Sequence, residues 1–282
     1  MNQSPPRLFD RDAILRRRTR AARIAGDTFL RQEAVEAIAE RLSAVNRHFG
    51  RGVLIDSGAD VPAVLAHRAD GWLRVEPGHD EALGLEPQSF DLAVSILTLH
   101  AVNDLPGVLA QIRRALKPDG LFMAALFGGA TLFELREALA AGELETTGGV
   151  SPRVYPFADV RDLGGLLQRA AFALPVADVE RTTVLYREFS SLVRDLRALG
   201  ETNALTERSL KPLSRETLAA TLAHYGAHHS EPDGRLRATF EIVYLTGWAP
   251  HESQQQPLKP GSAKARLADA LETTEKSLPR EK

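Results

Sequence analysis

Cysteine is missing from this 282-residue sequence, and tryptophan and methionine occur only twice each. Without cysteine the chain cannot form disulfides, use a thiolate nucleophile, or hold zinc or iron–sulfur clusters through sulfur. The most apolar run, residues 121–132, contains two glycines and is too short to cross a bilayer. An apolar secretion signal is also missing near the start, where Asp10 and Asp12 are unusual for an organellar transit peptide. These absences predict a cytoplasmic protein.

A surplus of charge is missing too, because 35 basic and 37 acidic residues give a formal net charge of -2. Nucleic-acid binding normally requires a concentrated basic surface, so nucleic acid is not an expected partner. Basic residues do gather between residues 7 and 23, in a pattern typical of a helix. We interpret this basic arm as a solvated helix face that covers the edge of a domain. The alternative is contact with an anionic partner, including peripheral contact with a membrane surface.

Three common catalytic signatures are absent as well. The sequence has no Gly-x-Ser-x-Gly elbow, no phosphate-binding loop with its lysine and no His-Glu-x-x-His helix. Hydrolase, NTPase and zinc-protease activities therefore lack support. His228 and His229 lie near Glu231, but neighbouring side chains on a regular element point in different directions. We predict a surface turn there and no metal site.

Buried strands and amphipathic helices alternate along most of the chain. This alternation predicts βαβ units with right-handed crossovers, and hence an α/β fold with a mostly parallel sheet and helices on both faces. Apolar runs predict strands at 53–55, 72–76, 90–95, 121–126, 184–186 and 238–245, and apolar residues at helical spacing predict helices at 29–42, 61–67, 105–116, 131–140, 159–170 and 192–199.

The predicted organisation has three parts. Residues 1–48 form the basic arm and a helical cap, residues 49–250 form the α/β domain, and residues 251–282 form a polar tail. Within the domain we predict a helical insertion at about 190–228. The tail is rich in Gln, Pro, Lys and Ser, so it is expected to be extended, although its pattern is compatible with a short helix at 263–271.

The most informative segment is 89–121. A buried strand is followed there by a polar loop containing His100, an amphipathic helix and a tight turn into the next strand. Ligands of open α/β sheets bind beyond the carboxyl ends of the strands, so chemistry is expected in this loop. The imidazole of His100 can act as a general base, because an unperturbed histidine titrates near neutral pH. Alternatively, Asn103 or Asp104 caps the following helix and His100 only packs over the strand end.

This segment resembles the class I S-adenosylmethionine-dependent methyltransferases of type 11. More narrowly, it resembles the branch that contains the biotin-pathway malonyl carrier-protein methyltransferase and the fifth assembly factor of respiratory complex I. The sequence Leu-Thr-Leu-His-Ala-Val-Asn-Asp-Leu-Pro at 97–106 carries most of the resemblance. It implies a Rossmann-like sheet that ends in an antiparallel hairpin. Further matching motifs extend over nearly the whole chain, at residues 128–136, 151–153, 161–162, 168–169, 195–197, 200–204 and 246–250.

The resemblance implies S-adenosylmethionine as cofactor. Glycine after the first strand lets the backbone approach the methionine part of such a ligand, and a carboxylate after the second strand can accept hydrogen bonds from both ribose hydroxyls. The residues that match the cofactor side of the family are Asp56, Gly58, Glu76, Asp80 and Ser95.

Three features depart from the pattern of the family. Asp60 stands in place of the second glycine, and Ala101 stands where a tryptophan is usual. The chain between Glu76 and Phe90 is too short for the usual helix and third strand, so either about one βα unit is missing or two strands are fused into one. These departures predict a weakened cofactor side beside a retained substrate side.

The substrate side of the resemblance adds candidate binding residues. Guanidinium groups match carboxylates well, so arginines at this side are implied to grip an acidic or peptide substrate. The alternative is that they form salt bridges with Asp162, Asp195 and Glu201. The candidate catalytic residues are His100, Asn103 and Asp104, and the candidate substrate-binding residues are Arg153, Arg161, Arg197 and Asn203.

The resemblance implies a transferase that uses S-adenosylmethionine to methylate a protein or a carrier-bound substrate. The alternative is a non-methylating assembly or modification factor of respiratory complex I, acting on an arginine or as a scaffold. In that case the expected partner is a complex I subunit. The substrate and the oligomeric state are left open by the sequence.

Overall fold

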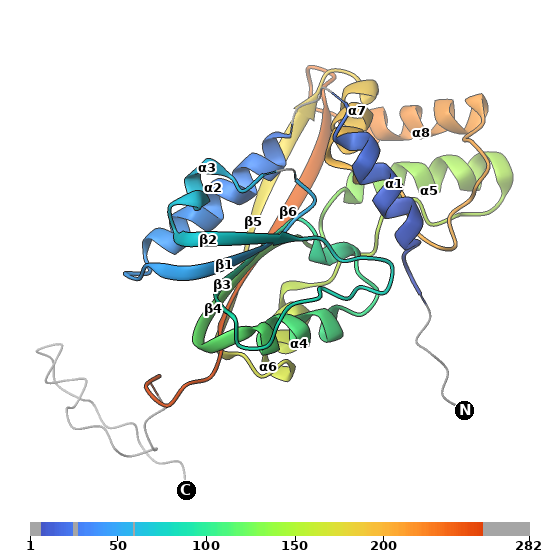
Figure 1. Cartoon of the computed structure of the whole chain (residues 1–282). Helices are drawn as coiled ribbons and strands as arrows, with labels where there is room; N and C mark the ends of the chain where they lie inside the picture. Colours follow the sequence, from blue (N-terminus) through green and yellow to red (C-terminus); the bar gives the residue numbers. More distant parts are fainter. Residues whose placement is uncertain (1–6, 25–27, 59, 256–282) are drawn as a thin grey trace, which may run out of the picture. The chain divides into compact units, whose positions relative to one another are not determined.

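The computed structural model of the chain describes residues 7–24, 28–58 and 60–255. The chain divides after Pro250 into a compact first unit and a second unit of residues 251–282. The helix expected at 263–271 lies outside the described residues. In chain order (Figure 1), the elements of the first unit are α1 (Arg11–Ala21), α2 (Phe29–Ser43), β1 (Phe49–Ile55), α3 (Ala63–Ala66), β2 (Ala69–Val75), β3 (Phe90–Ile96), α4 (Leu105–Ala115), β4 (Leu116–Phe127), α5 (Phe133–Thr147), α6 (Val160–Arg169), β5 (Ala173–Tyr186), α7 (Phe189–Leu199), α8 (Arg215–His228) and β6 (Leu236–Trp248).

The strands form one six-stranded sheet in the order β2-β1-β3-β4-β6-β5. Strands β1 to β4 pair in parallel, whereas β6 runs antiparallel to both β4 and β5. The predicted Rossmann-like α/β fold with an antiparallel hairpin is therefore confirmed. Ile55 pairs with Val75 on one side and with Ser95 on the other. Strands β1, β2 and β3 consequently end at the same edge of the sheet.

Helices cover both faces of this sheet (Figure 1). Side chains of a strand alternate between its faces, so Leu54 packs in the core under α2, α5, α7 and α8, and Val53 and Ile55 pack in the core under α4 and α6. All three side chains are fully buried. The buried parallel strands explain why apolar runs predicted β1, β3 and β4 so directly.

Helix α1 corrects the prediction of a solvated basic arm. The helix begins after Asp10, whose carboxylate accepts a hydrogen bond from the N–H of Ala13 at 3.0 Å. Arg11 and Arg18 on this helix are buried, at 5% and 6% exposure. The arginines of α1 thus point into the molecule as well as out of it. The helix is held against three loops by a small core of Phe9, Ala13, Ile14, Ala101, Tyr155, Ala204 and Leu205.

The link from β2 to β3 is short, as the sequence predicted. Residues 76–89 contain no helix or strand, and β3 pairs directly with β1. The sheet therefore lacks the βα unit that is usual at this place, and β2 forms its edge.

The later part of the chain differs from the prediction in three places. Strand β5 begins at Ala173, well before the predicted start. Its early part was missed because only Tyr186 of this edge strand is buried and polar residues at 178 and 180–183 interrupt its apolar pattern. Helix α5 extends to Thr147 instead of ending near residue 140. Helix α8 belongs to the predicted insertion and continues to His228, and His229 is buried at 7% exposure. The surface turn predicted at these two histidines is therefore wrong.

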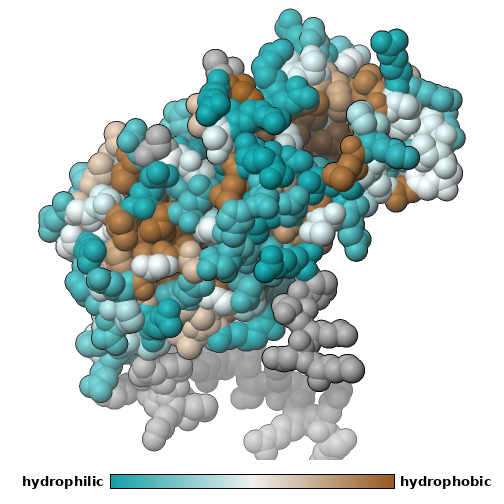
Figure 2. All heavy atoms as spheres, turned by 45° about the vertical axis from the view of Figure 1, so that its right-hand side comes forward, coloured by the Kyte–Doolittle hydropathy of each residue, from teal (hydrophilic) through white to brown (hydrophobic). Residues whose placement is uncertain are grey.

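Within the described ranges, every helix is too short or too polar to cross a bilayer. Figure 2 shows polar residues over most of the visible face of the molecule, with a recessed apolar patch among them. Apolar hollows of this kind are typical of ligand sites.

Candidate functional site

Three acidic residues lie beyond the ends of the first two parallel strands. Asp56 follows β1, Glu76 follows β2, and Glu81 lies in the loop that leads to β3. Asp56 and Glu81 are buried, and the side chain of Glu76 is 27% exposed. A buried carboxylate needs a compensating partner. Each of the three acids faces an arginine from α1 or α2.

Asp56 is paired with Arg31 of α2. The guanidinium Nη2 forms an ion pair with Oδ2 of the carboxylate, and a side chain at residue 58 would displace this guanidinium. The carbonyl of Gly58 accepts a hydrogen bond from Arg74. The Nε atom of Arg31 is buried and has no hydrogen-bond partner among the described residues. Asp60, which replaces the second glycine of the family, is exposed, so its charge is solvated.

Glu76 is paired with Arg18 of α1, whose Nη1 lies 2.8 Å from Oε1 of the carboxylate. The other terminal nitrogen of Arg18, Nη2, is buried without a hydrogen-bond partner in the described part of the chain. The same is true of Oγ of Ser95, which is fully buried at the end of β3. We call Asp56, Glu76, Ser95, Arg18 and Arg31 the strand-end site.

Asp80, which the sequence assigned to the cofactor side, is followed by Glu81, and Glu81 is the buried one of these two acids. Its Oε1 accepts hydrogen bonds from N and Nδ2 of Asn103 at 2.7 and 3.1 Å, and its Oε2 accepts one from N of Asp104 at 2.8 Å. Arg11 approaches the same carboxylate, with Nε 3.6 Å from Oε1. Asp80 is exposed. Glu81 therefore fixes the loop that follows β3.

Asn103 and Asp104 have structural roles in this loop. Asp104 accepts a hydrogen bond from N of Gly107 at 2.8 Å and so caps α4, as the alternative interpretation predicted. Oδ1 of Asn103 accepts a hydrogen bond from N of Phe9 at 2.8 Å, which ties the segment before α1 to the loop. Among the three candidate catalytic residues, His100 is the one left in a position suited to chemistry.

His100 forms a buried pair with Glu201. Its Nε2 lies 3.0 Å from Oε2 of the carboxylate, and the two side chains are only 2% and 9% exposed. The rings of Phe127 and Phe157 flank the imidazole, with centroids 5.0 and 5.7 Å away. Burial by itself would raise the pKa of Glu201, but attraction to and hydrogen bonding with His100 hold the pKa of that carboxyl below its ordinary value.

An ionised Glu201 fixes the orientation of the imidazole. A carboxylate next to one ring nitrogen favours the proton on that nitrogen, which makes Nε2 the donor and leaves Nδ1 as the acceptor. Nδ1 of His100 is buried and has no hydrogen-bond partner among the described residues. This nitrogen can therefore bind a polar group or take up a proton.

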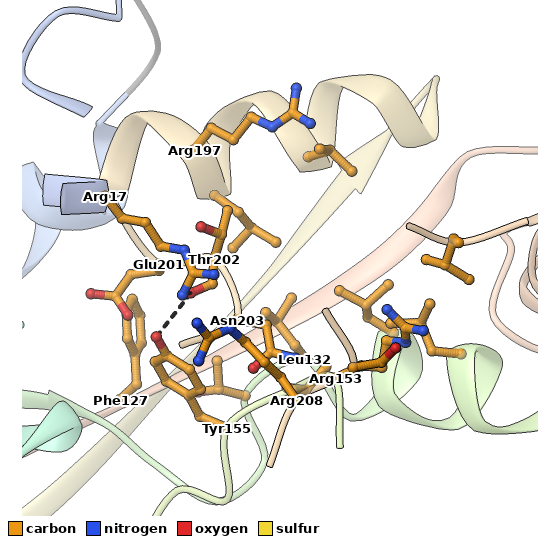
Figure 3. A pocket seen from close by; sticks show the side chains of 18 of the residues that line it. Arg17, Phe127, Leu132, Arg153, Tyr155, Arg197, Glu201, Thr202, Asn203 and Arg208 are labelled. Atoms are coloured by element: carbon orange, nitrogen blue, oxygen red, sulfur yellow. Dashed lines mark hydrogen bonds between the residues drawn. The ribbon is translucent and has the colours of Figure 1, made fainter. Parts of the chain in front are cut away.

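A cavity of about 650 Å³ adjoins this pair, and Glu201 forms part of its wall. We call it the Tyr155 cavity. Figure 3 shows the hydroxyl of Tyr155 pointing to Thr202, whose carbonyl accepts its hydrogen bond at 2.9 Å. Burial raises the pKa of Tyr155, and the charge of Glu201 raises it further. The phenol therefore stays protonated and acts as a donor in an otherwise largely apolar wall.

Three of the four predicted substrate-binding residues lie at this cavity, namely Arg153, Arg197 and Asn203. Arg161 does not, because it is exposed on α6, which packs on the opposite face of the sheet from α5 and α7. Nε of Arg153 lies 2.8 Å from Oε1 of Glu143 rather than beside one of the predicted acids. The side-chain amide of Asn203 donates to a backbone carbonyl at 2.8 Å.

Two arginines that the sequence analysis did not assign to the site also line this cavity. Arg208 is paired with Asp10, with Nη2 2.8 Å from Oδ2. Arg17 donates to the carbonyl of Thr202 at 3.2 Å, and burial lowers its pKa. Both arginines are close to Tyr155 in Figure 3. The rim of the cavity is therefore rich in cations.

A second cavity of about 1040 Å³ adjoins the first. The two cavities share lining residues, and the second one is bordered mainly by apolar side chains. Together they offer more room than one small molecule needs. The shared residues are Leu139, Arg153, Val154 and Phe157.

Residues 38–124 match the family profile described as a methyltransferase domain. A malonyl-[acyl-carrier protein] O-methyltransferase of Halorhodospira halophila is 35% identical over 244 residues, which cover 78% of this chain and 81% of that protein. The chain belongs to the class I S-adenosylmethionine-dependent methyltransferase family. The human protein named arginine-hydroxylase NDUFAF5, mitochondrial, is 38% identical over 280 residues, which cover 91% of this chain and 81% of that protein.

Two further proteins are similar to this chain over part of its length. The protein of the same name from Dictyostelium discoideum is 44% identical over 195 residues, 69% of this chain, but the chain spans only 45% of that relative. The YcgJ protein from Bacillus subtilis shares the fold with a TM-score of 0.52 at 14% identity, over 78% of this chain and 99% of that chain. The last comparison concerns the fold alone.

Proposed function

We propose that this chain binds S-adenosylmethionine at the strand-end site and transfers its methyl group to an acidic group of a protein or carrier-bound substrate in the Tyr155 cavity. The observation that carries the proposal is a set of buried polar atoms without hydrogen-bond partners among the described residues. They are Nη2 of Arg18, Nε of Arg31, Oγ of Ser95 and Nδ1 of His100. Native proteins satisfy nearly all such atoms, so their concentration here favours a polar ligand.

The residues present fit the proposed cofactor. Its carboxylate suits the guanidinium of Arg31 beside Gly58, and its ammonium group suits Asp56. Glu76 has its Oε1 paired with Arg18, and its carboxylate can accept hydrogen bonds from ribose hydroxyls. Asp80 is too exposed to be an equal candidate. The exposed position of Asp60 means that the altered glycine turn adds no buried charge.

When bound, S-adenosylmethionine supplies an electrophilic methyl group on a sulfonium. A carboxylate substrate attacks as the anion and releases no proton, so the protein has to orient it and exclude water rather than deprotonate it. Arg17 and Arg197 supply guanidinium groups for this orientation, and Phe127 is part of the apolar wall. For a substrate that does lose a proton, His100, which pairs with Glu201 of the cavity wall, is our candidate acceptor.

The two adjoining cavities support a substrate attached to a larger molecule. Their combined volume suits an extended arm or peptide better than a compact metabolite, and the first cavity has a cationic rim. An acidic group at the end of such an arm would be attracted to this rim. The malonyl-[acyl-carrier protein] methyltransferases among the relatives are named for a substrate of this chemical kind.

Calorimetric titration of the full chain with S-adenosylmethionine tests the cofactor part of this proposal. We expect saturable binding that Glu76→Ala weakens by at least about tenfold, because charge-assisted hydrogen bonds are lost. The matched control is Glu86→Ala, since Glu86 is an exposed acid of the same loop and should leave binding unchanged. Failure of the wild-type chain to bind at millimolar cofactor would exclude methyl transfer.

A second candidate function is a non-methylating factor for respiratory complex I, modifying an arginine or acting as a scaffold. It is favoured by the human relative named NDUFAF5, which aligns over 91% of this chain. It is also favoured by the arginine partners of Asp56, Glu76 and Glu81, which a cofactor would have to share. Capture of a complex I subunit by a chain that does not bind S-adenosylmethionine would establish this alternative.

A further inference from the structure

Helices α5 and α8 pack against each other on one side of the sheet (Figure 1). Three side chains meet between them: Glu137 of α5, His224 of α8 and His229 at the end of α8. One ligand atom from each residue lies within 4.8 Å of the other two. These residues line neither the Tyr155 cavity nor the strand-end site.

The distances within this cluster suit a metal ion. Nε2 of His224 lies 3.6 Å from Oε1 of Glu137, and Nε2 of His229 lies 3.2 Å from Oε2. Two ligands bound at about 2.1 Å in tetrahedral geometry are about 3.4 Å apart. The two observed separations lie on either side of this value, and the three ligand atoms all lie within 4.8 Å of one another.

The histidine nitrogens are not engaged in hydrogen bonds. Nε2 of His224 and Nε2 of His229 are both buried, and neither has a hydrogen-bond partner among the described residues, although a carboxylate is near. The rings are held in place by stacking of His224 on His228 at 4.1 Å and by the edge contact of His229 with Phe133 at 5.9 Å. Two fixed ring nitrogens thus converge on one carboxylate without bonding to it.

We propose that Glu137, His224 and His229 bind a divalent transition-metal ion of the zinc class. Two imidazoles and one carboxylate suit such ions, whereas calcium and magnesium prefer sites made of oxygen alone. The side chain of Glu137 is 55% exposed, so ion entry is open and the remaining coordination position faces solvent. The ion joins α5 to α8 and is independent of the proposed methyl transfer.

Calorimetric titration of the full chain without a histidine tag, using Zn²⁺ alone, tests the proposal, and visible absorbance of bound Co²⁺ reports the geometry. We expect one ion per chain and a rise in melting temperature with Zn²⁺. Glu137→Gln, His224→Gln and His229→Gln should each weaken binding at least about tenfold. The controls are Glu145→Gln on α5 and Glu216→Gln on α8, two exposed residues outside the cluster whose variants should bind as the wild type does.

Two results would overturn the site. One is a wild-type chain that shows no saturable Zn²⁺ or Co²⁺ binding. The other is binding that survives in Glu137→Gln, a change at an exposed side chain that leaves the packing of α5 intact. Circular dichroism of each variant separates loss of the ion from loss of the fold.

Discussion

Replacing Glu201 by glutamine removes one charge from the pair that orients His100. The glutamine has the same shape and can still accept a hydrogen bond, so the change tests the charge and not the packing. Both side chains are almost completely buried, at 2% and 9% exposure, so solvent screens their interaction little. The consequence should therefore appear in the stability of the fold as well as in the site.

The expected loss can be derived from the geometry of the pair. The two atoms are 3.0 Å apart, and a hydrogen bond to a charged group contributes about 1.5–3 kcal/mol. Because the amide keeps part of this bond, we expect Glu201→Gln to lower the free energy of unfolding by about 2 kcal/mol at neutral pH. For a body of this size the melting temperature should fall by about 4–8 °C.

The pH dependence of stability provides a second test of the charge on Glu201. The pKa of Glu201 in the folded protein lies below its ordinary value of 4.5. An acid whose pKa is lowered on folding stabilises the fold when the pH is above the ordinary pKa of that acid. This contribution is lost as the pH falls through the pKa in the folded state. The difference in stability between the wild type and Glu201→Gln should therefore shrink as the pH is lowered below about 4.5.

Denaturant unfolding followed by circular dichroism at neutral and acidic pH measures both effects. Glu207→Gln is the control, because Glu207 is exposed nearby and its neutralisation should change stability little. A Glu201→Gln variant that unfolds like the wild type at neutral pH would show that the charge of Glu201 does not stabilise the fold. A difference between the two proteins that grows on acidification would show the same.

Two further predictions concern packing and capping. Gly142→Ala should destabilise the fold by about 1–3 kcal/mol in urea unfolding, because the added carbon would lie 2.7 Å from the backbone nitrogen of Thr221 on α8. Gly149→Ala, where no atom lies within 4 Å of the added carbon, is its control, and equal stability of the two variants would contradict the close packing of α5 on α8. Asp104→Ala should cost about 1 kcal/mol in the same assay by removing the hydrogen bond to N of Gly107 at the start of α4. Retention of full stability by Asp104→Asn, which can still cap, would support this cause, and equal loss in both variants would exclude it.

The sequence predicted the centre of the sheet better than its edges. Strands β1, β3 and β4 are buried on both faces, so their apolar runs identified them. Strand β5 lies at the edge, and polar residues at 178 and 180–183 interrupt its apolar pattern, so only the part near Tyr186 was identified. Edge strands of this kind give only a weak alternating signal.

The candidate site was predicted in the same uneven way. Asp56 and Glu76 could be assigned from the family pattern, because each lies at the end of a strand and strand ends of a parallel sheet share one edge. Their arginine partners could not be predicted. Arg18 and Arg31 reach these carboxylates only because α1 and α2 fold back over the edge of the sheet. The same holds for Glu201, which lies 101 residues from His100 in the sequence.

Helix α1 joins three loops that are far apart in the chain. Arg11 donates to the carbonyls of Pro77, Gly78 and Ala101, and Arg17 on the next turns of the helix donates to the carbonyl of Thr202. Residues that share partners and one rigid element are energetically coupled. The effects of substitutions in α1 on the free energy of unfolding are therefore not additive. The contribution of each arginine depends on whether the other arginines still bind the loops.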